Sequence, residues 1–247
     1  MISVRKLYKN FGKQKVLEGV DLNLSPGDVM ALVGKNGCGK STLIQAIAGL
    51  IPVDGGAVFI DDVPTGIRYH SVLRRVGFAF DQPIYVEGFS GGKYLEFVGR
   101  LYGLDKPESQ RRATELLEFF DLPTGRKKIA DYSKGMKRKV SFAAALIHKP
   151  RYLILDEPFD GMDAATVLKA SEQLRELAVQ GTGVLLVTHH NSLIRDLATT
   201  VSTMEQGRIS QVRPLEVWWQ ELPSLLRSNT KSTGRHGVPS SDSCYLP

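Results

Sequence analysis

The chain has 247 residues, 42% of them apolar, which is enough for one large or two small domains with a packed core. The formal net charge is +6, but the basic residues are scattered rather than massed, so composition does not indicate nucleic-acid binding. Two cysteines, Cys38 and Cys244, are too few for a disulfide scaffold, and they favour a reducing compartment.

We expect neither a signal peptide nor a membrane-spanning helix. The first residues, MISVRKLYKNFGKQ, are charged and lack the apolar stretch of a signal peptide. A membrane span needs about 20 apolar residues, and runs such as AAALI and GVLLV are far shorter. A role at a membrane would therefore be peripheral or through a partner chain.

Hydrophobic patterning predicts the elements in chain order. Strands are expected at 2–8, 16–24 and 28–34, then a helix at 41–50, then strands at 55–62 and 76–80. The pattern from 91 to 148 is helical, with breaks at glycines and prolines. Two buried-strand runs, 152–156 and 183–188, flank a helix at 164–180, and a hairpin is expected over 199–212.

This alternation of strands and helices predicts an α/β fold with a mostly parallel sheet. The strand-rich residues 1–60 predict an N-terminal antiparallel β subdomain, and the helical stretch predicts an inserted α-helical subdomain at about 83–148. We expect one domain over residues 1–227. Residues 228–247 are rich in Ser, Gly and Pro and are expected to form a disordered tail.

A phosphate-binding loop is predicted between the strand at 28–34 and the helix at 41–50. The segment GKNGCGKST fits the pattern G-x-x-x-x-G-K-[ST], in which glycines let several N–H groups surround one anion at a helix start. Lys40 is expected to reach the β- and γ-phosphates, and Ser41 to bind Mg²⁺. The alternative is a Gly-rich turn with an exposed lysine. The expected binding set is Gly34, Lys35, Asn36, Gly37, Cys38, Gly39, Lys40, Ser41 and Thr42.

Two acids follow the buried strand at 152–156, at the end of a strand where ligands bind in open α/β sheets. Asp156 is expected to hold the Mg²⁺ shell, and Glu157 to orient and deprotonate an attacking water. Paired acids are also common as solvated strand caps. The phosphate loop earlier in the chain favours the catalytic interpretation.

With these two motifs, residues 1–212 resemble the nucleotide-binding subunit of ATP-binding cassette (ABC) transporters, which have a P-loop NTPase fold. FAFDQP resembles the Q-loop, which implies that Gln82 touches Mg²⁺ or the water. FDGMD resembles the D-loop and ends at Asp163, while LLVTHH resembles the switch strand and places His189 at the γ-phosphate. Phe11 falls where the family stacks an aromatic ring on adenine. Each residue also has an alternative role: Phe11 only packs against the strands, Gln82 caps a turn, and His189 has a structural role.

Two Ser-Gly stretches compete for the family's signature segment. YSKGM, at 132–136, precedes a helical run that leads straight into the strand carrying the two acids, whereas several helix breaks follow FSGGK, at 89–93. We therefore assign YSKGM as the signature. The resemblance implies that Ser90 lies in the groove for the membrane partner, and the alternative is that it only caps a helix. Ser133 and Gly135 are expected to face a phosphate, which the resemblance implies is bound to another copy of the chain.

The resemblance implies an ATP-hydrolysing motor with ATP and Mg²⁺ as cofactors. Its implied partners are a second copy or a paralogous ATPase subunit, and a separate transmembrane permease that holds it on the cytoplasmic face of the cell membrane. The YSKGM variant resembles exporters whose membrane part is a separate chain. A soluble ABC-type ATPase acting on ribosomes or DNA is the alternative, although a single cassette disfavours it and no nucleic-acid partner is expected. A P-loop kinase would need neither the signature nor His189.

Overall fold

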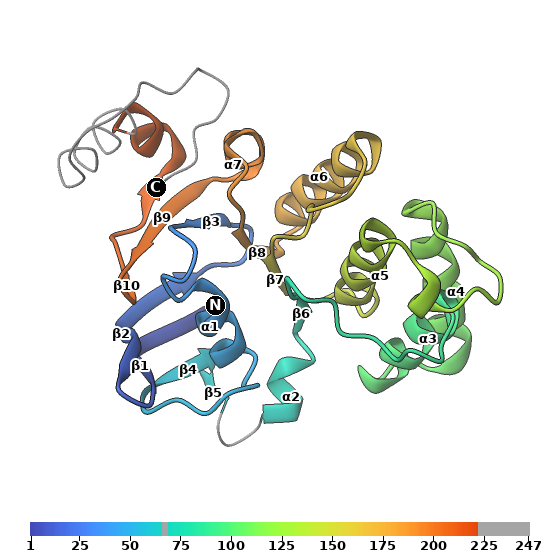
Figure 1. The fold of residues 1–247 in the computed structure, drawn as a ribbon, viewed down its shortest axis with the longest axis horizontal. Coiled ribbons are helices and arrows are strands. Elements are labelled where there is room, and N and C mark those ends of the chain that lie inside the picture. Colours follow the sequence, from blue (N-terminus) through green and yellow to red (C-terminus); the bar gives the residue numbers. More distant parts are fainter. Residues whose placement is uncertain (66–68, 222–247) are drawn as a thin grey trace.

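The computed structural model describes residues 1–65 and 69–221, which form two sheets and the helices around them (Figure 1). The tail predicted at 228–247 lies outside the described residues. Within the described ranges, none of the helices combines the length and hydrophobicity needed to cross a membrane.

The smaller sheet is antiparallel and gathers strands from the first part of the chain. Its strand order is β2-β1-β4-β5. Burial alternates over residues 20–24 of β2, as the period of two in the sequence predicts, whereas β1 buries Ile2, Ser3 and Val4 in succession. The bounds are β1 Ile2–Phe11, β2 Gln14–Leu24, β4 Gly55–Ile60 and β5 Val63–Pro64.

The larger sheet has a parallel centre, in which β6, β7, β8, β3 and β9 lie side by side. All residues of β3, β7 and β8 are buried, because both faces of the sheet are covered and the sequence supplies continuous apolar runs. Two short strands, β10 and β11, pair antiparallel with β9. The bounds are β3 Val29–Val33, β6 Val76–Ala79, β7 Tyr152–Asp156, β8 Gly183–Val187, β9 Thr200–Glu205, β10 Arg208–Ile209 and β11 Arg213–Pro214.

The two faces of the larger sheet bury different partners. Leu153 and Leu155 of β7 pack in a cluster with α3, α4, α5 and α6, whereas Tyr152 and Ile154 pack with α1 and the smaller sheet. Residues 215–221 form a further helical turn that buries Trp218 against Ala31 of β3. The bounds are α1 Lys40–Ile47, α2 Tyr69–Leu73, α3 Gly91–Leu101, α4 Lys106–Phe119, α5 Lys134–Leu146, α6 Ala164–Val179 and α7 Asn191–Leu197.

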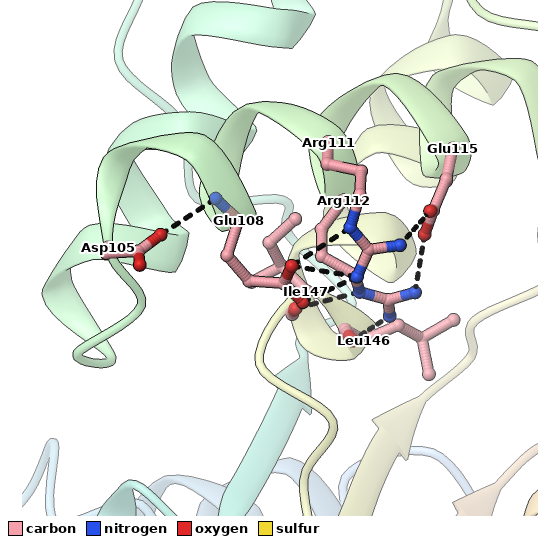
Figure 2. A network of polar contacts seen from close by, with 7 residues as sticks. All are labelled: Asp105, Glu108, Arg111, Arg112, Glu115, Leu146 and Ile147. Carbon is pink, nitrogen blue, oxygen red and sulfur yellow. Dashed lines mark hydrogen bonds and ion pairs between the residues drawn. The ribbon is translucent and has the colours of Figure 1, made fainter.

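Polar contacts tie α4 to the end of α5 (Figure 2). Arg112 donates from Nε to the carbonyl oxygen of Ile147, at 3.3 Å, and from Nη2 to that of Leu146, at 3.0 Å. These bonds satisfy carbonyl groups that a helix end leaves free. Arg112 also contacts Glu115, at 3.1 Å. The network fixes the point at which the chain leaves α5 for β7.

The elements follow the predicted order, and the hairpin around Gln206-Gly207 is formed by β9 and β10. The predicted N-terminal antiparallel sheet is confirmed by β1, β2, β4 and β5. Within the same span, β3 joins the larger sheet between β8 and β9, and α1 packs beside it. The fully apolar run of β3 suits a position inside a covered parallel sheet rather than an antiparallel sheet with an open face.

Candidate active site

The loop between β3 and α1 has a backbone that requires glycine. Gly37 and Gly39 have φ angles of 79° and 114°, in the region that side chains disfavour. A Cβ atom on Gly34 would lie 2.3 Å from the carbonyl oxygen of Met204, so a side chain there would collide with the end of β9. The glycine spacing in the sequence therefore reflects both the loop's turn and its close contact with the sheet.

Lys40, the first residue of α1, turns its ammonium group back over this loop. Its Nζ donates to the carbonyl oxygens of Gly34, at 2.6 Å, and Lys35, at 3.0 Å. The Sγ atom of Cys38 lies 3.9 Å from the same nitrogen. The loop thus combines a fixed positive charge with the N-terminal end of a helix, which is an arrangement that attracts an anion.

A cavity of about 400 Å³ joins this loop to the carboxyl ends of β7 and β8. It is lined by Lys40 and Ser41 from α1, by the two acids at the carboxyl end of β7, and by His189 from the segment after β8. The phosphate loop and the two acids predicted from separate motifs are therefore brought together. The lining residues are Val16, Asn36, Gly37, Gly39, Lys40, Ser41, Thr42, Asp81, Asp156, Glu157, Asp160 and His189.

Asp156 is buried at the floor of the cavity, with 3% of its surface exposed. Burial raises the pKa of Asp156, and the nearby charges of Asp81 and Glu157 act in the same direction. A hydrogen bond from Ser41 and the charge of Lys40 oppose that shift. The Ser41 hydroxyl beside the buried carboxylate of Asp156 offers oxygen ligands of the kind that fit Mg²⁺.

Glu157 has an unusual backbone and one free oxygen. Its φ angle is 46°, and its backbone N–H donates to the carbonyl oxygen of Val187 on the neighbouring strand, at 2.9 Å. Its Oε1 lies 3.1 Å from Nδ1 of His189. Its Oε2 is buried and has no hydrogen-bond partner within the described part of the chain. A buried acceptor of this kind is suited to holding a proton donor such as water.

Gln82 lies outside this cavity. It lines a neighbouring cavity of about 490 Å³ with residues of α5, whereas Asp81, the residue before it, lines both. Buried Arg138 holds Asp81 through an ion pair of 2.9 Å and also donates to the backbone oxygens of Phe80 and Asp81. Asp81 and Asp160 also line the cavity, although neither was predicted from the sequence. An acid directly before the glutamine was the available signal for Asp81.

Both Ser-Gly stretches cap helices. Ser133 accepts a hydrogen bond from the N–H of Met136 at the start of α5, at 3.2 Å, and Ser90 accepts one from Lys93 at the start of α3, at 3.4 Å. Neither serine lines the cavity around Lys40. Capping is therefore common to both segments and does not distinguish them.

The glycines of these stretches pack against neighbouring loops. A Cβ on Gly135 would lie 2.2 Å from the carbonyl oxygen of Gly161, in the loop after β7. A Cβ on Gly91 would lie 2.7 Å from the hydroxyl of Tyr132. The start of α3 thus contacts the segment that precedes α5, so the two Ser-Gly stretches are neighbours in the fold.

The two remaining predicted residues lie away from the cavity. Phe11 is half exposed, so its side chain is not packed between strands as the alternative required. The Nζ atom of Lys9 lies 5.1 Å from the centre of the Phe11 ring. Asp163 caps α6 and forms an ion pair of 2.7 Å with Lys139. The hydrogen bond from Lys139 holds the pKa of Asp163 well below its usual range.

Comparison with known proteins identifies the family. A family profile described as ABC transporter matches residues 17–160, more than half of the chain. The chain belongs to the ABC transporter family. The resemblance noted from the motifs and the expected P-loop NTPase fold are thereby confirmed.

Two relatives and one solved structure illustrate the likeness to other ABC proteins. The chain is 36% identical to the daunorubicin resistance ATP-binding protein DrrA3 of Streptomyces coeruleorubidus, over 84% of this chain and 66% of that protein. It is 37% identical to the Fe(3+) ions import ATP-binding protein FbpC of Streptomyces avermitilis, over 89% of this chain and 64% of that protein. It thus spans about two thirds of the length of these relatives. An ATP-binding subunit of an ABC transporter superposes with a TM-score of 0.84 and 29% identity, over 90% of this chain and 93% of that structure.

Proposed function

We propose that this chain is the ATP-binding and ATP-hydrolysing subunit of an ABC transporter. The proposal rests on one observation, which is that the phosphate loop, the two acids and His189 all line the same cavity. The names of both relatives above describe ATP-binding proteins, which agrees with this assignment.

The loop at 34–42 binds the phosphates of ATP in this proposal. Its N–H groups and the start of α1 surround the phosphate chain, and Lys40 exchanges its contacts with loop carbonyls for the β- and γ-phosphates. Ser41 and Asp156 would hold Mg²⁺, which when bound offsets phosphate charge. Gln82, which lines the neighbouring cavity, would be a further contact of that ion. The half-exposed ring of Phe11 stacks on adenine.

Glu157 acts as the general base for the attacking water. Its free Oε2 accepts a hydrogen bond from the water and takes the proton as the oxygen attacks the γ-phosphate. His189 contacts Glu157 through Nδ1 and faces the same cavity, so it orients the base and the γ-phosphate together. The products are ADP and phosphate.

The active form in this proposal is a head-to-tail dimer around two ATP. Ser133 and Gly135 stand at the start of a helix yet lie outside the cavity of their own chain. They therefore serve the γ-phosphate held by a second copy or a paralogous subunit. The helix start at Ser133 favours that anion. Asp163 belongs to the loop that meets the partner.

We infer that the dimer drives a separate transmembrane permease on the cytoplasmic face of the cell membrane. The domain spans 1–227, and the helical subdomain at about 83–148 faces the permease. One relative is named for drug resistance and the other for iron import, so their names do not agree on direction. The YSKGM variant of the signature is the feature that favours export.

The test is ATP binding and hydrolysis by the purified chain. We expect Mg²⁺-dependent release of phosphate, and we expect Lys40→Ala to lose nucleotide binding while keeping its fold. ATP binding that persists at the wild-type affinity in Lys40→Ala would contradict the site. Isolation with a polytopic membrane protein supports the transporter role, whereas isolation with ribosomes supports the soluble ATPase.

A further inference from the structure

Two histidines and an aspartate cluster beside the proposed ATP site. Asp160, His189 and His190 each offer one imidazole nitrogen or carboxylate oxygen, and these three atoms lie within 4.8 Å of one another. Asp160 and His189 line both the cavity around Lys40 and a neighbouring cavity of about 560 Å³, while His190 lines the second cavity. The cluster therefore connects the two spaces.

The parallel sheet explains why these residues meet. Strands β7 and β8 are paired neighbours, with Asp156 opposite Val187 at their carboxyl ends. Asp160 follows β7 in the chain, and His189 and His190 follow β8. Because parallel strands end at the same edge of a sheet, the three side chains converge there.

One pair already has the spacing of two ligands on a metal ion. The Nε2 of His190 lies 3.2 Å from Oδ1 of Asp160. Zinc bonds of about 2.0–2.1 Å in a tetrahedral shell place adjacent ligand atoms about 3.3 Å apart. The ligand atom of His189 lies within 4.8 Å of the other two, and 52% of the His189 side chain is exposed, so solvent leaves room for the shift that brings it to an ion.

A carboxylate also orients the third ligand. Glu157 Oε1 lies 3.1 Å from Nδ1 of His189, so this contact favours the tautomer with the proton on Nδ1. Nε2 is then the atom with a lone pair for an ion. Histidine ligands of metals commonly donate their other ring N–H to a carboxylate in this way. This contact distinguishes the cluster from an ordinary surface ion pair between His190 and Asp160.

We propose that Asp160, His189 and His190 bind Zn²⁺ or a chemically similar transition-metal ion, and that the bound ion inhibits ATP hydrolysis. Two imidazoles and one carboxylate suit Zn²⁺ with water as a fourth ligand, whereas Mg²⁺ prefers oxygen ligands such as those at Ser41 and Asp156. The inhibition rests on the proposed function. An ion on Nε2 of His189 withdraws that nitrogen from the nucleotide.

The test is a calorimetric titration of nucleotide-free protein with ZnCl₂, paired with Mg-ATPase assays with and without Zn²⁺. His190→Gln removes one ligand, and the His190 side chain makes no capping bond to α7, so the start of that helix stays unchanged. We expect wild type to bind one ion at the cluster, and His190→Gln to weaken that binding at least about tenfold. Its basal hydrolysis without Zn²⁺ should equal that of wild type, while inhibition by Zn²⁺ is lost. Glu172→Gln, on the exposed side of α6, should behave as wild type in both measurements.

Unchanged Zn²⁺ affinity in His190→Gln overturns the site. Inhibition that persists in His190→Gln but disappears in Cys38→Ser also overturns it, because the thiol of the phosphate loop is then the inhibitory ligand. If the wild-type chain hydrolyses no ATP even without Zn²⁺, the proposed function fails, and the titration still decides the metal site by itself.

Discussion

His189 and Glu157 contact each other across two neighbouring strands, with 3.1 Å between Nδ1 and Oε1. The contact leaves Oε2 of Glu157 as a buried acceptor without a partner in the described part of the chain. The two oxygens of one carboxylate are thereby placed in different surroundings. One oxygen fixes the orientation of the side chain, and the other is available to a water molecule.

Glu157→Gln should lower ATP turnover by about 10²- to 10⁴-fold, because an amide keeps the shape and hydrogen-bonding reach of Glu157 but cannot accept the proton. ATP affinity should stay within about twofold of wild type, since Lys40 and the loop glycines are unchanged. Phosphate release and nucleotide binding measure the two quantities. Glu172→Gln, on the exposed side of α6, is the control and should hydrolyse ATP at the wild-type rate. Full activity in Glu157→Gln would contradict the assignment of the base.

Ser133→Arg and Ser90→Arg make the same change at two helix caps. Each loses a cap worth about 1 kcal/mol, so their stabilities should be similar. Ser133→Arg should also abolish hydrolysis while leaving ATP binding intact, because it places a long side chain where we position the partner's γ-phosphate. Ser90→Arg should keep the basal ATPase rate. Measuring both rates without the permease decides the matter, and the opposite result would make FSGGK the signature.

Bound ATP should protect Cys38 from a maleimide. The thiol is partly exposed and lies 3.9 Å from the Lys40 ammonium, in the loop that we expect the phosphates of ATP to cover. Labelling should proceed without nucleotide, inactivate the protein and slow markedly with Mg-ATP present. Cys38→Ser with residual labelling at the same rate would show that another residue reacts.

His148 should make folding stability fall in mild acid. Its ring stacks on Tyr102 with centroids 3.6 Å apart, and burial lowers its pKa from 6.5 to about 4. The backbone of Val76 opposes that shift weakly, because neither ring nitrogen reaches regular hydrogen-bond geometry. The folded state therefore binds this proton less readily than the unfolded state. The stabilising effect is complete above pH 6.5, is lost as the pH falls towards 4 and changes no further below that value.

The change amounts to about 3 kcal/mol at most. His148→Phe keeps the stacked ring and removes the titrating group. Between pH 7 and pH 4, wild type should lose that much more unfolding free energy than the variant, measured by denaturant titration at each pH. Parallel losses in the two proteins would show that His148 does not titrate in this range.

The order of strands and helices could be predicted because the spacing of apolar residues distinguishes the two, and because glycines and prolines mark where many of these elements end. The run before the phosphate loop is apolar at every position, and it is the buried strand β3. Its place between β8 and β9 could not be predicted, because patterning does not specify which parallel strands become neighbours. Asp81 was missed for a related reason. Its position depends on buried Arg138, which is 57 residues further along the chain.

The close fit of Gly135 against Gly161 has a mechanical consequence. The space leaves no room for a Cβ, so the start of α5 and the loop after β7 are packed directly against each other. In the head-to-tail pair that we propose, the first of these segments would serve the partner's nucleotide, while the second follows the acids of its own site. A shift of that loop on ATP cleavage would then be passed to the segment that serves the other site, so we expect the two sites to be coupled.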